Sequence, residues 1–155
     1  MCGRYTLTAK QEELARKFLL KPARQEALQD FKPRFNIAPS QQVVAILEDG
    51  ERDIERVAYM RRWGLVPFWA KDLNSGYNMF NARSETVSEK PAFRDAVKYR
   101  RCILPASGFF EWQRGDGRKP KAPHYFYPFD GEALAIAGLW EIWKGPEPGP
   151  GGKTV

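Results

Sequence analysis

Short apolar stretches alternate with polar turns along most of this chain, a pattern typical of antiparallel strands. The stretches that this pattern predicts as strands are 3–7, 42–50, 53–62, 101–113, 124–129 and 134–143. A turn near Asp49 and Gly50 joins the second strand to the third. Ser107 and Gly108 interrupt the fourth, and glycines at 115–117 turn the chain toward the fifth.

One helix is predicted near the N-terminus. Thr8 followed by Gln11 has the spacing of a capping box. Leu14 and Phe18 then fall on one helical face, and Pro22 marks the end of the helix.

A second short helix is predicted to begin at Pro91, with Phe93 and Val97 on its buried face. The segment 31–40 has two prolines and no helical period, so it is expected to be extended or looped. No repeat or interdomain linker interrupts the sequence. These patterns predict a single α+β domain over 1–155, mostly antiparallel β with a few short helices.

Composition narrows the class of protein. The 155 residues, 43% apolar and 14% aromatic, suffice for one domain with a sizeable core. The net charge of +6 suits a polyanion such as nucleic acid, although a solvated basic surface is the commoner explanation. Two cysteines make no disulfide framework, and neither a signal peptide nor a membrane span is recognisable, so a soluble cytoplasmic protein is expected.

Cys2 is the most informative residue for chemistry. Removal of Met1 would leave Cys2 with a free α-amine and a thiol on adjacent carbons. Such a 1,2-aminothiol condenses with an aldehyde to a Schiff base, and the thiol then closes a thiazolidine ring. An α-amine has a pKa of about 8, so at neutral pH a fraction of it is already the uncharged nucleophile. The alternative is that Cys2 has no chemical role and is simply a small residue next to the initiator methionine.

Other segments carry candidate polar chemistry. Glu111, between Phe110 and Trp112, is a candidate proton shuttle, or else a strand residue that points to water while its aromatic neighbours point inward. Asn81 would orient a reacting group and Arg83 would grip phosphate, unless they are an ordinary turn and a surface cation.

The aromatic segment 63–70 is expected to lie mostly in the core, but any of its rings exposed beside basic residues would stack on unpaired bases. The single histidine, His124, is expected to be a strand residue rather than a catalyst. With two distant cysteines it makes no metal-ligand set, so no metal or cofactor is expected.

Taken in order, six segments resemble the SOS-response-associated peptidase (SRAP) family. They are MCGRYTL, FNIAPSQ, RRWGLVPFWA, FNARSET, ILPASGFFEW and AGLWE. The resemblance implies a barrel-like antiparallel sheet. It also implies capture of abasic sites in single-stranded DNA, in the DNA damage response, by an N-terminal cysteine that self-processing exposes. A stable thiazolidine cross-link would shield the lesion.

Carried onto this sequence, the resemblance makes Cys2 the nucleophile, Asn81 a hydrogen-bonding partner of the reacting centre and Glu111 the proton shuttle. The residues that fall where the family contacts DNA are Arg4, Asn36, Pro39, Trp69 and Arg83. The expected partner is single-stranded DNA with abasic sites, and a bacterial protein would be associated with the nucleoid. The sequence does not indicate an oligomeric state.

The sequence departs from the family in one respect. The family uses a histidine in a later segment, and His124 has no such context, so that role is not transferred to it. The chain is therefore expected to be C-terminally truncated relative to the family, with exposed apolar sheet edges or a compensating partner segment. Two other functions stay open: a thiol peptidase that acts on other proteins, and a non-covalent binder of single-stranded nucleic acid.

Overall fold

The structure, a computed structural model, describes residues 3–29, 31–49, 55–113 and 122–145. The strands are β1 Arg4–Leu7, β2 Arg34–Ile37, β3 Gln42–Asp49, β4 Glu55–Arg62, β5 Arg101–Ala106, β6 Gly108–Trp112, β7 Pro123–Phe126 and β8 Leu134–Leu139. The helices are α1 Gln11–Lys17, α2 Glu26–Gln29 and α3 Ala96–Tyr99, with 3₁₀ turns η1 Pro22–Arg24 and η2 Leu73–Gly76.

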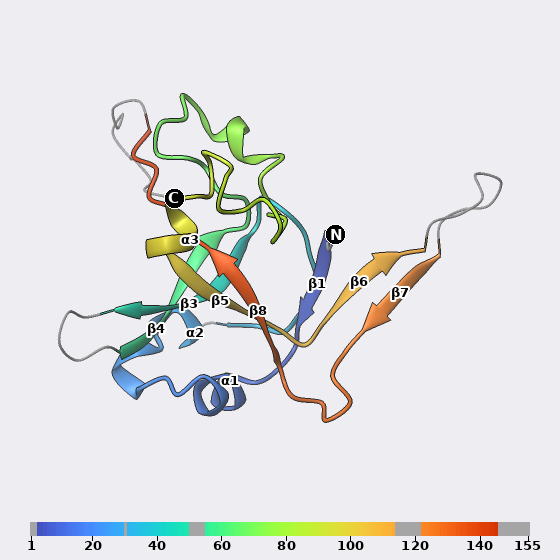
Figure 1. The fold of residues 1–155 in the computed structure, drawn as a ribbon. Helices are drawn as coiled ribbons and strands as arrows, with labels where there is room; N and C mark the ends of the chain where they lie inside the picture. Colours follow the sequence, from blue (N-terminus) through green and yellow to red (C-terminus); the bar gives the residue numbers. More distant parts are fainter. Residues whose placement is uncertain (1–2, 30, 50–54, 114–121, 146–155) are drawn as a thin grey trace.

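The described strands form two four-stranded sheets, in the orders β2-β1-β6-β7 and β4-β3-β5-β8. Every strand pairing in them is antiparallel, which confirms the predicted α+β class. β5 runs on into β6, so one stretch of chain belongs to both sheets (Figure 1). Closure into a barrel stays a prediction.

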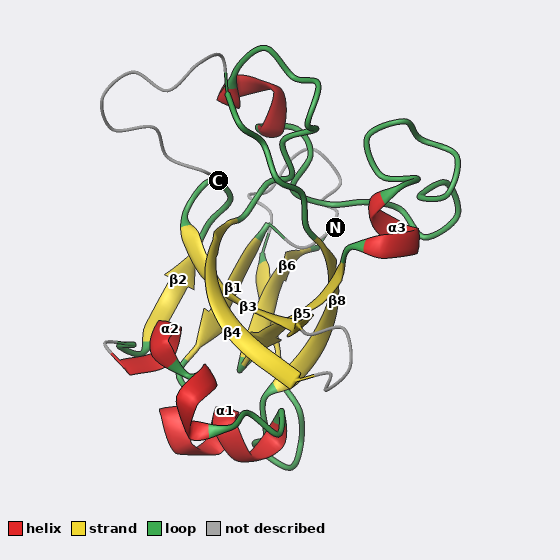
Figure 2. Ribbon diagram, turned by 90° about the vertical axis from the view of Figure 1, so that its left-hand side faces the viewer, coloured by secondary structure: helices red, strands yellow, loops and turns green. Residues whose placement is uncertain are grey.

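The core lies between the sheets and extends under the helices at one end. Leu7 of β1, Ile37 of β2 and Val44 of β3 are buried together with Leu14 of α1 and Leu28 of α2. Figure 2 shows α1 and α2 at one end of the strands and the long loops between β4 and α3 at the other. The start of β1 lies at the loop end.

The first helix begins and ends differently from the prediction. The capping interaction is made by Lys10, whose backbone N–H donates to the Glu13 carboxylate at 3.0 Å. The Thr8 N–H instead donates to the Ser107 hydroxyl at 2.8 Å, because Thr8 is still attached to the sheet. Leu19, with a positive φ of 56°, follows the last turn, so the helix ends before Pro22.

The second predicted helix is shorter than expected. Residues 91–95 form turns, and the regular helix is only α3. The Phe93 and Arg94 N–H groups both donate to the Lys90 carbonyl at 2.9 Å, so the chain makes mixed turns there before a regular ladder starts. Phe93 is buried as predicted, whereas Val97 is half-buried.

The last two strands are also shorter than predicted. β7 ends at Phe126, two residues before Pro128, which lacks the N–H that a ladder needs. β8 ends at Leu139, and the next N–H, from Trp140, donates to the Arg100 carbonyl at 3.0 Å. The turns predicted at Gly50 and at 115–117, and the end of the chain from 146, lie outside the described residues.

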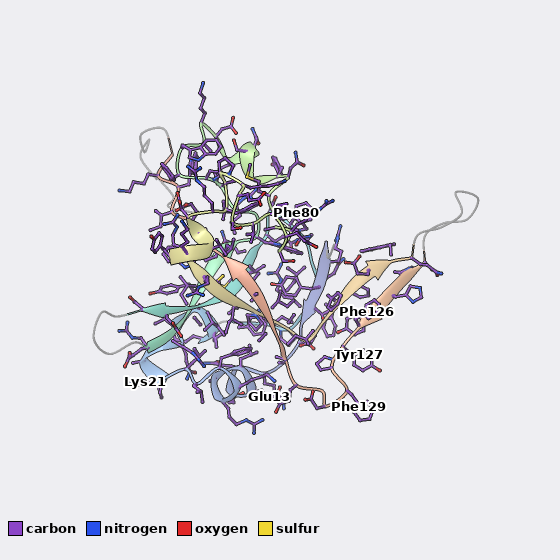
Figure 3. All side chains as sticks on the ribbon, viewed as in Figure 1. Glu13, Lys21, Phe80, Phe126, Tyr127 and Phe129 are labelled. Carbon is purple, nitrogen blue, oxygen red and sulfur yellow. The ribbon has the colours of Figure 1, made fainter. Side chains whose placement is uncertain are left out.

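The hairpin of β6 and β7 projects from the body of the molecule and carries exposed aromatic side chains (Figures 1 and 3). Phe126, Tyr127 and Phe129 are all exposed at or just beyond the edge strand β7. The predicted exposed apolar edge is thus confirmed. In the described part of the chain, no helix has the length and apolarity to cross a membrane.

The packing of α1 yields a stability prediction. Leu14→Ala should lower the free energy of unfolding by about 2–5 kcal/mol, because the fully buried side chain leaves a cavity. The control is Leu19→Ala in the same region, where the side chain is 72% exposed and the change should stay within about 0.5 kcal/mol. Urea unfolding followed by circular dichroism measures both. Equal effects would contradict the burial of α1.

Candidate functional site

The candidate site is built around the start of β1. This strand lies between β2 and β6, with Tyr5 opposite Ile37 on one side and Phe109 on the other. Cys2 lies outside the described residues, and Gly3 leads directly into the strand. Two ladders therefore determine where the described N-terminal end of β1 lies.

Glu111 lies on the inner face of β6. Tyr5 and Phe109 are register partners that pack in the core, and side chains two residues apart share a face of a strand. Glu111 therefore shares the face of Phe109 and is half-buried. Trp112, on the opposite face, is exposed. The alternative in which both aromatic neighbours of Glu111 point inward therefore fails at Trp112.

Asn81 follows a loop that is attached closely to the core. The Trp63 indole N–H donates to the Phe80 carbonyl at 2.9 Å, and the Leu65 N–H donates to the Met79 carbonyl at 3.1 Å. Asn81 itself is half-buried. It lines a cavity of about 210 Å³ together with Tyr5 and Trp63, so the loop residue and β1 border the same space.

Backbone geometry makes this loop compact. Gly64 has a positive φ of 127°, and a Cβ there would lie 2.9 Å from the Gly76 carbonyl oxygen. A Cβ on Gly76 would lie 2.8 Å from Val66. Glycine at both positions thus allows the two segments of the loop to pack in direct contact. This close approach packs the chain at Gly64 directly against the chain at Gly76.

Two of the predicted DNA-contacting residues meet on the outer face of the first sheet. The Arg4 guanidinium donates to the Asn36 side-chain carbonyl at 2.9 Å, and both side chains are exposed. Pro39 is half-buried at the corner after β2, where the next N–H, from Ser40, donates to the Trp63 carbonyl at 2.7 Å. This corner therefore borders the loop that carries Asn81.

The remaining predicted DNA contacts, Trp69 and Arg83, lie on the loops between β4 and α3. Trp69 is 55% exposed and its neighbour Phe68 is 64% exposed, whereas Trp63 is only 8% exposed. Lys71 and Arg83 are exposed cations on the same loops. Exposed aromatic rings and exposed cations thus occur on the same loops, a combination found in proteins that bind unpaired bases.

Sequence reasoning missed two features of this site. It placed Trp63 in the core without a polar role, although the indole N–H binds the residue before Asn81. It also gave His124 no place near the site, whereas the register sets His124 directly across from Glu111. Neither contact has a local signal, because the partners are 17 and 13 residues apart in the chain.

Among the described residues, no group of three or more His, Cys, Asp or Glu side chains is arranged to hold a metal ion. The second cysteine, Cys102 of β5, is buried and lines the cavity. Burial raises the pKa of its thiol to about 11, although the positive charge of Arg61 acts in the opposite direction. Cys102 is thus a neutral packing residue near neutral pH.

Fold and site define a small α+β domain in which the first strand leads away from the N-terminus beside a half-buried carboxylate. The chain belongs to the SOS response associated peptidase (SRAP) family, because the model of that family matches residues 1–154.

Similar proteins from other organisms support this assignment. The chain is 42% identical over 150 residues to the abasic site processing protein YoqW of Bacillus subtilis (strain 168), covering 97% of this chain and 64% of YoqW. It is 32% identical over 143 residues to the abasic site processing protein HMCES of Rattus norvegicus, covering 82% of this chain and 40% of HMCES. The chain thus spans less than two thirds of the length of these curated relatives.

Solved structures share the fold. A protein from Bordetella bronchiseptica superposes with a TM-score of 0.77 at 27% identity, covering 99% of this chain and 68% of that one. A protein from Bacteroides thetaiotaomicron gives a TM-score of 0.74 at 25% identity, covering 93% and 62%.

The environment of Cys102 yields a reactivity prediction. In the native protein near pH 8, iodoacetamide should leave Cys102 unmodified, because the thiol is buried and its raised pKa keeps it protonated. In concentrated guanidinium chloride the same residue should react fully. Mass spectrometry of tryptic peptides measures both. Rapid native labelling of Cys102 would contradict the buried position in β5.

Proposed function

We propose that this protein binds single-stranded DNA and captures abasic sites covalently through Cys2. The observation that carries the proposal is the placement of Glu111: it is half-buried on the inner face of β6, beside the strand that Cys2 and Gly3 lead into. The abasic site processing proteins YoqW and HMCES are relatives of this chain, which supports the same substrate class.

The proposed reaction balances without a redox step. The α-amine of Cys2 adds to the aldehyde carbon of the ring-opened abasic sugar, and the carbinolamine loses one water to give a Schiff base. The thiol then adds across the C=N bond, forming a C–S bond and returning one proton to nitrogen. The products are a thiazolidine and water.

Glu111 and Asn81 would assist at separate points. The Glu111 carboxyl group would donate a proton to the carbinolamine hydroxyl, which then leaves as water. The resulting carboxylate would accept a proton from the thiol when the thiol adds to the C=N bond. The Asn81 amide, which borders the same cavity as Tyr5, would hydrogen-bond the reacting oxygen or nitrogen. Met1 must first be removed, by self-processing in this proposal, because only then is the α-amine of Cys2 free.

The DNA strand would be held mainly through its backbone and by stacking. Arg4 with its partner Asn36, the corner at Pro39, and Arg83 supply cationic and polar groups that suit phosphate. Trp69, exposed beside Lys71, would stack on or wedge between bases. Contacts of this kind carry little base information, so we expect weak sequence preference.

The covalent step is tested with an oligonucleotide that holds one abasic site. Wild-type protein lacking Met1 should give a band that survives a denaturing gel, whereas Cys2→Ser should give none, since serine cannot close a thiazolidine. Cys102→Ala is the matched control, because it removes the other thiol, and should cross-link normally. Undamaged oligonucleotide should give no band with any variant.

Other outcomes separate the alternatives. If wild-type protein gives no band but still binds single strands in a salt-sensitive way, the protein is a non-covalent binder and the proposal of covalent capture is wrong. Turnover of unrelated peptides that is lost in Cys2→Ser, without any cross-link, would favour the thiol peptidase.

The binding contribution of Arg83 is tested separately. Arg83→Ala should weaken binding to any single strand and reduce the slope of log K against log salt concentration by about 0.7, the value for one lost phosphate contact. Arg16→Ala is the control: it removes an exposed cation from α1, at the opposite end of the strands. Equal slopes for the two variants, measured by fluorescence anisotropy, would place the DNA elsewhere.

A further inference from the structure

Trp63 connects three parts of the candidate site. Its ring packs edge-on against Tyr5 of β1, with centroids 5.2 Å apart, and against Phe80, with centroids 6.1 Å apart. Its indole N–H donates to the carbonyl of Phe80, the residue before Asn81. Figure 3 labels Phe80 at the loop end of the strands, the end at which β1 starts.

The indole is itself firmly attached. The Trp63 backbone N–H donates to the Gln41 carbonyl at 2.9 Å, and the Trp63 backbone carbonyl accepts from the Ser40 N–H at 2.7 Å. The side chain is 8% exposed. An indole N–H that is held by its own backbone and by packing on two rings has little freedom to move. The Phe80 carbonyl that accepts from it is therefore held in one position.

The hydrogen bond reaches Asn81 through one rigid unit. The Phe80 carbonyl belongs to the peptide group that also contains the Asn81 nitrogen, and this group is planar. Fixing its oxygen therefore limits the orientation of the Asn81 nitrogen and of the bond to its Cα. The nearby bond from Leu65 N–H to the Met79 carbonyl, 3.1 Å long, restrains the preceding turn.

We propose that Trp63 is a positioning residue, whose indole N–H sets the place of the Asn81 side chain relative to the N-terminal end of β1. This inference rests on the proposed function for its kinetic consequence, because Asn81 is expected to bind the reacting centre. It also makes a structural claim about Asn81 that does not depend on that function.

The chain offers a matched control in Trp143. Its indole N–H also donates to a backbone carbonyl, that of Ala70, at 2.7 Å, and its side chain is also 8% exposed. It packs with Val66 and Ala70 rather than with Tyr5 and Phe80. Trp63→Phe and Trp143→Phe therefore remove the same donor from equally buried places, and only the first is bound to the residue before Asn81.

The experiment measures cross-linking rates to abasic DNA over a range of protein concentrations. Trp63→Phe should lower the limiting rate roughly ten-fold, as misplacement of a reacting group does, while the half-saturating concentration and binding to undamaged DNA stay unchanged. Trp143→Phe should keep the wild-type limiting rate. Equal limiting rates for the two variants would overturn the inference.

A double-variant comparison separates positioning from general damage. If Trp63 acts through Asn81, Trp63→Phe should cause no further loss in an Asn81→Ala background. A full ten-fold loss in that background would overturn the inference. Should Trp63→Phe fail to fold, benzothienylalanine at position 63 keeps the ring shape and removes only the N–H, and the same rates decide the question.

Nuclear magnetic resonance supplies a readout that needs no reaction. The side-chain amide signals of Asn81 should shift in the Trp63 variant and stay in place in Trp143→Phe. Unshifted Asn81 signals in the Trp63 variant would overturn the inference. A wild-type chain that forms no cross-link would instead overturn the proposed function, and the Asn81 signals would then decide the positioning role alone.

Discussion

The bend at Ser107 and Gly108 is the constraint on which both sheets depend. The chain passes there from β5 into β6, and each strand pairs in a different sheet. Gly108 cannot carry a side chain, because a Cβ would lie 2.4 Å from the ring of Tyr125. The Tyr125 hydroxyl in turn shares a 2.7 Å hydrogen bond with the Thr6 hydroxyl, so the bend also ties β7 to β1.

The same bend fastens the C-terminal end of β1. The Ser107 N–H donates to the Thr6 carbonyl at 2.8 Å, and the Ser107 hydroxyl accepts from the N–H groups of Thr8 and Ala9. α1 follows directly and packs Leu14 into the core. With one end of β1 held by these contacts and its sides held by β2 and β6, the opposite end is directed toward the loops that carry Asn81.

The two chemical alternatives for the N-terminus differ in what surrounds the same amine and thiol. A peptidase needs a binding cleft for an extended peptide, whereas aldehyde capture needs a proton shuttle, a hydrogen-bonding amide and a surface for a polyanion. The described residues supply a half-buried Glu111, a cavity bordered by Asn81, and exposed aromatic rings beside Lys71. This distribution is consistent with the proposed capture, which the cross-linking experiment tests.

Local pattern was sufficient to predict most of the strands and the break at Ser107, because alternation and turn residues are properties of adjacent residues. It did not predict β2, which lies in the segment 31–40 that was expected to be extended or looped. The reactivity of Cys2 stays a prediction from its place in the sequence. Local pattern was not sufficient for the cap of α1, since Ser107, about a hundred residues away, binds the N–H of Thr8. Nor could it decide whether Glu111 faces inward or which residue holds Phe80. Those depend on strand register and on the contact between Trp63 and a distant loop, which only the tertiary structure determines.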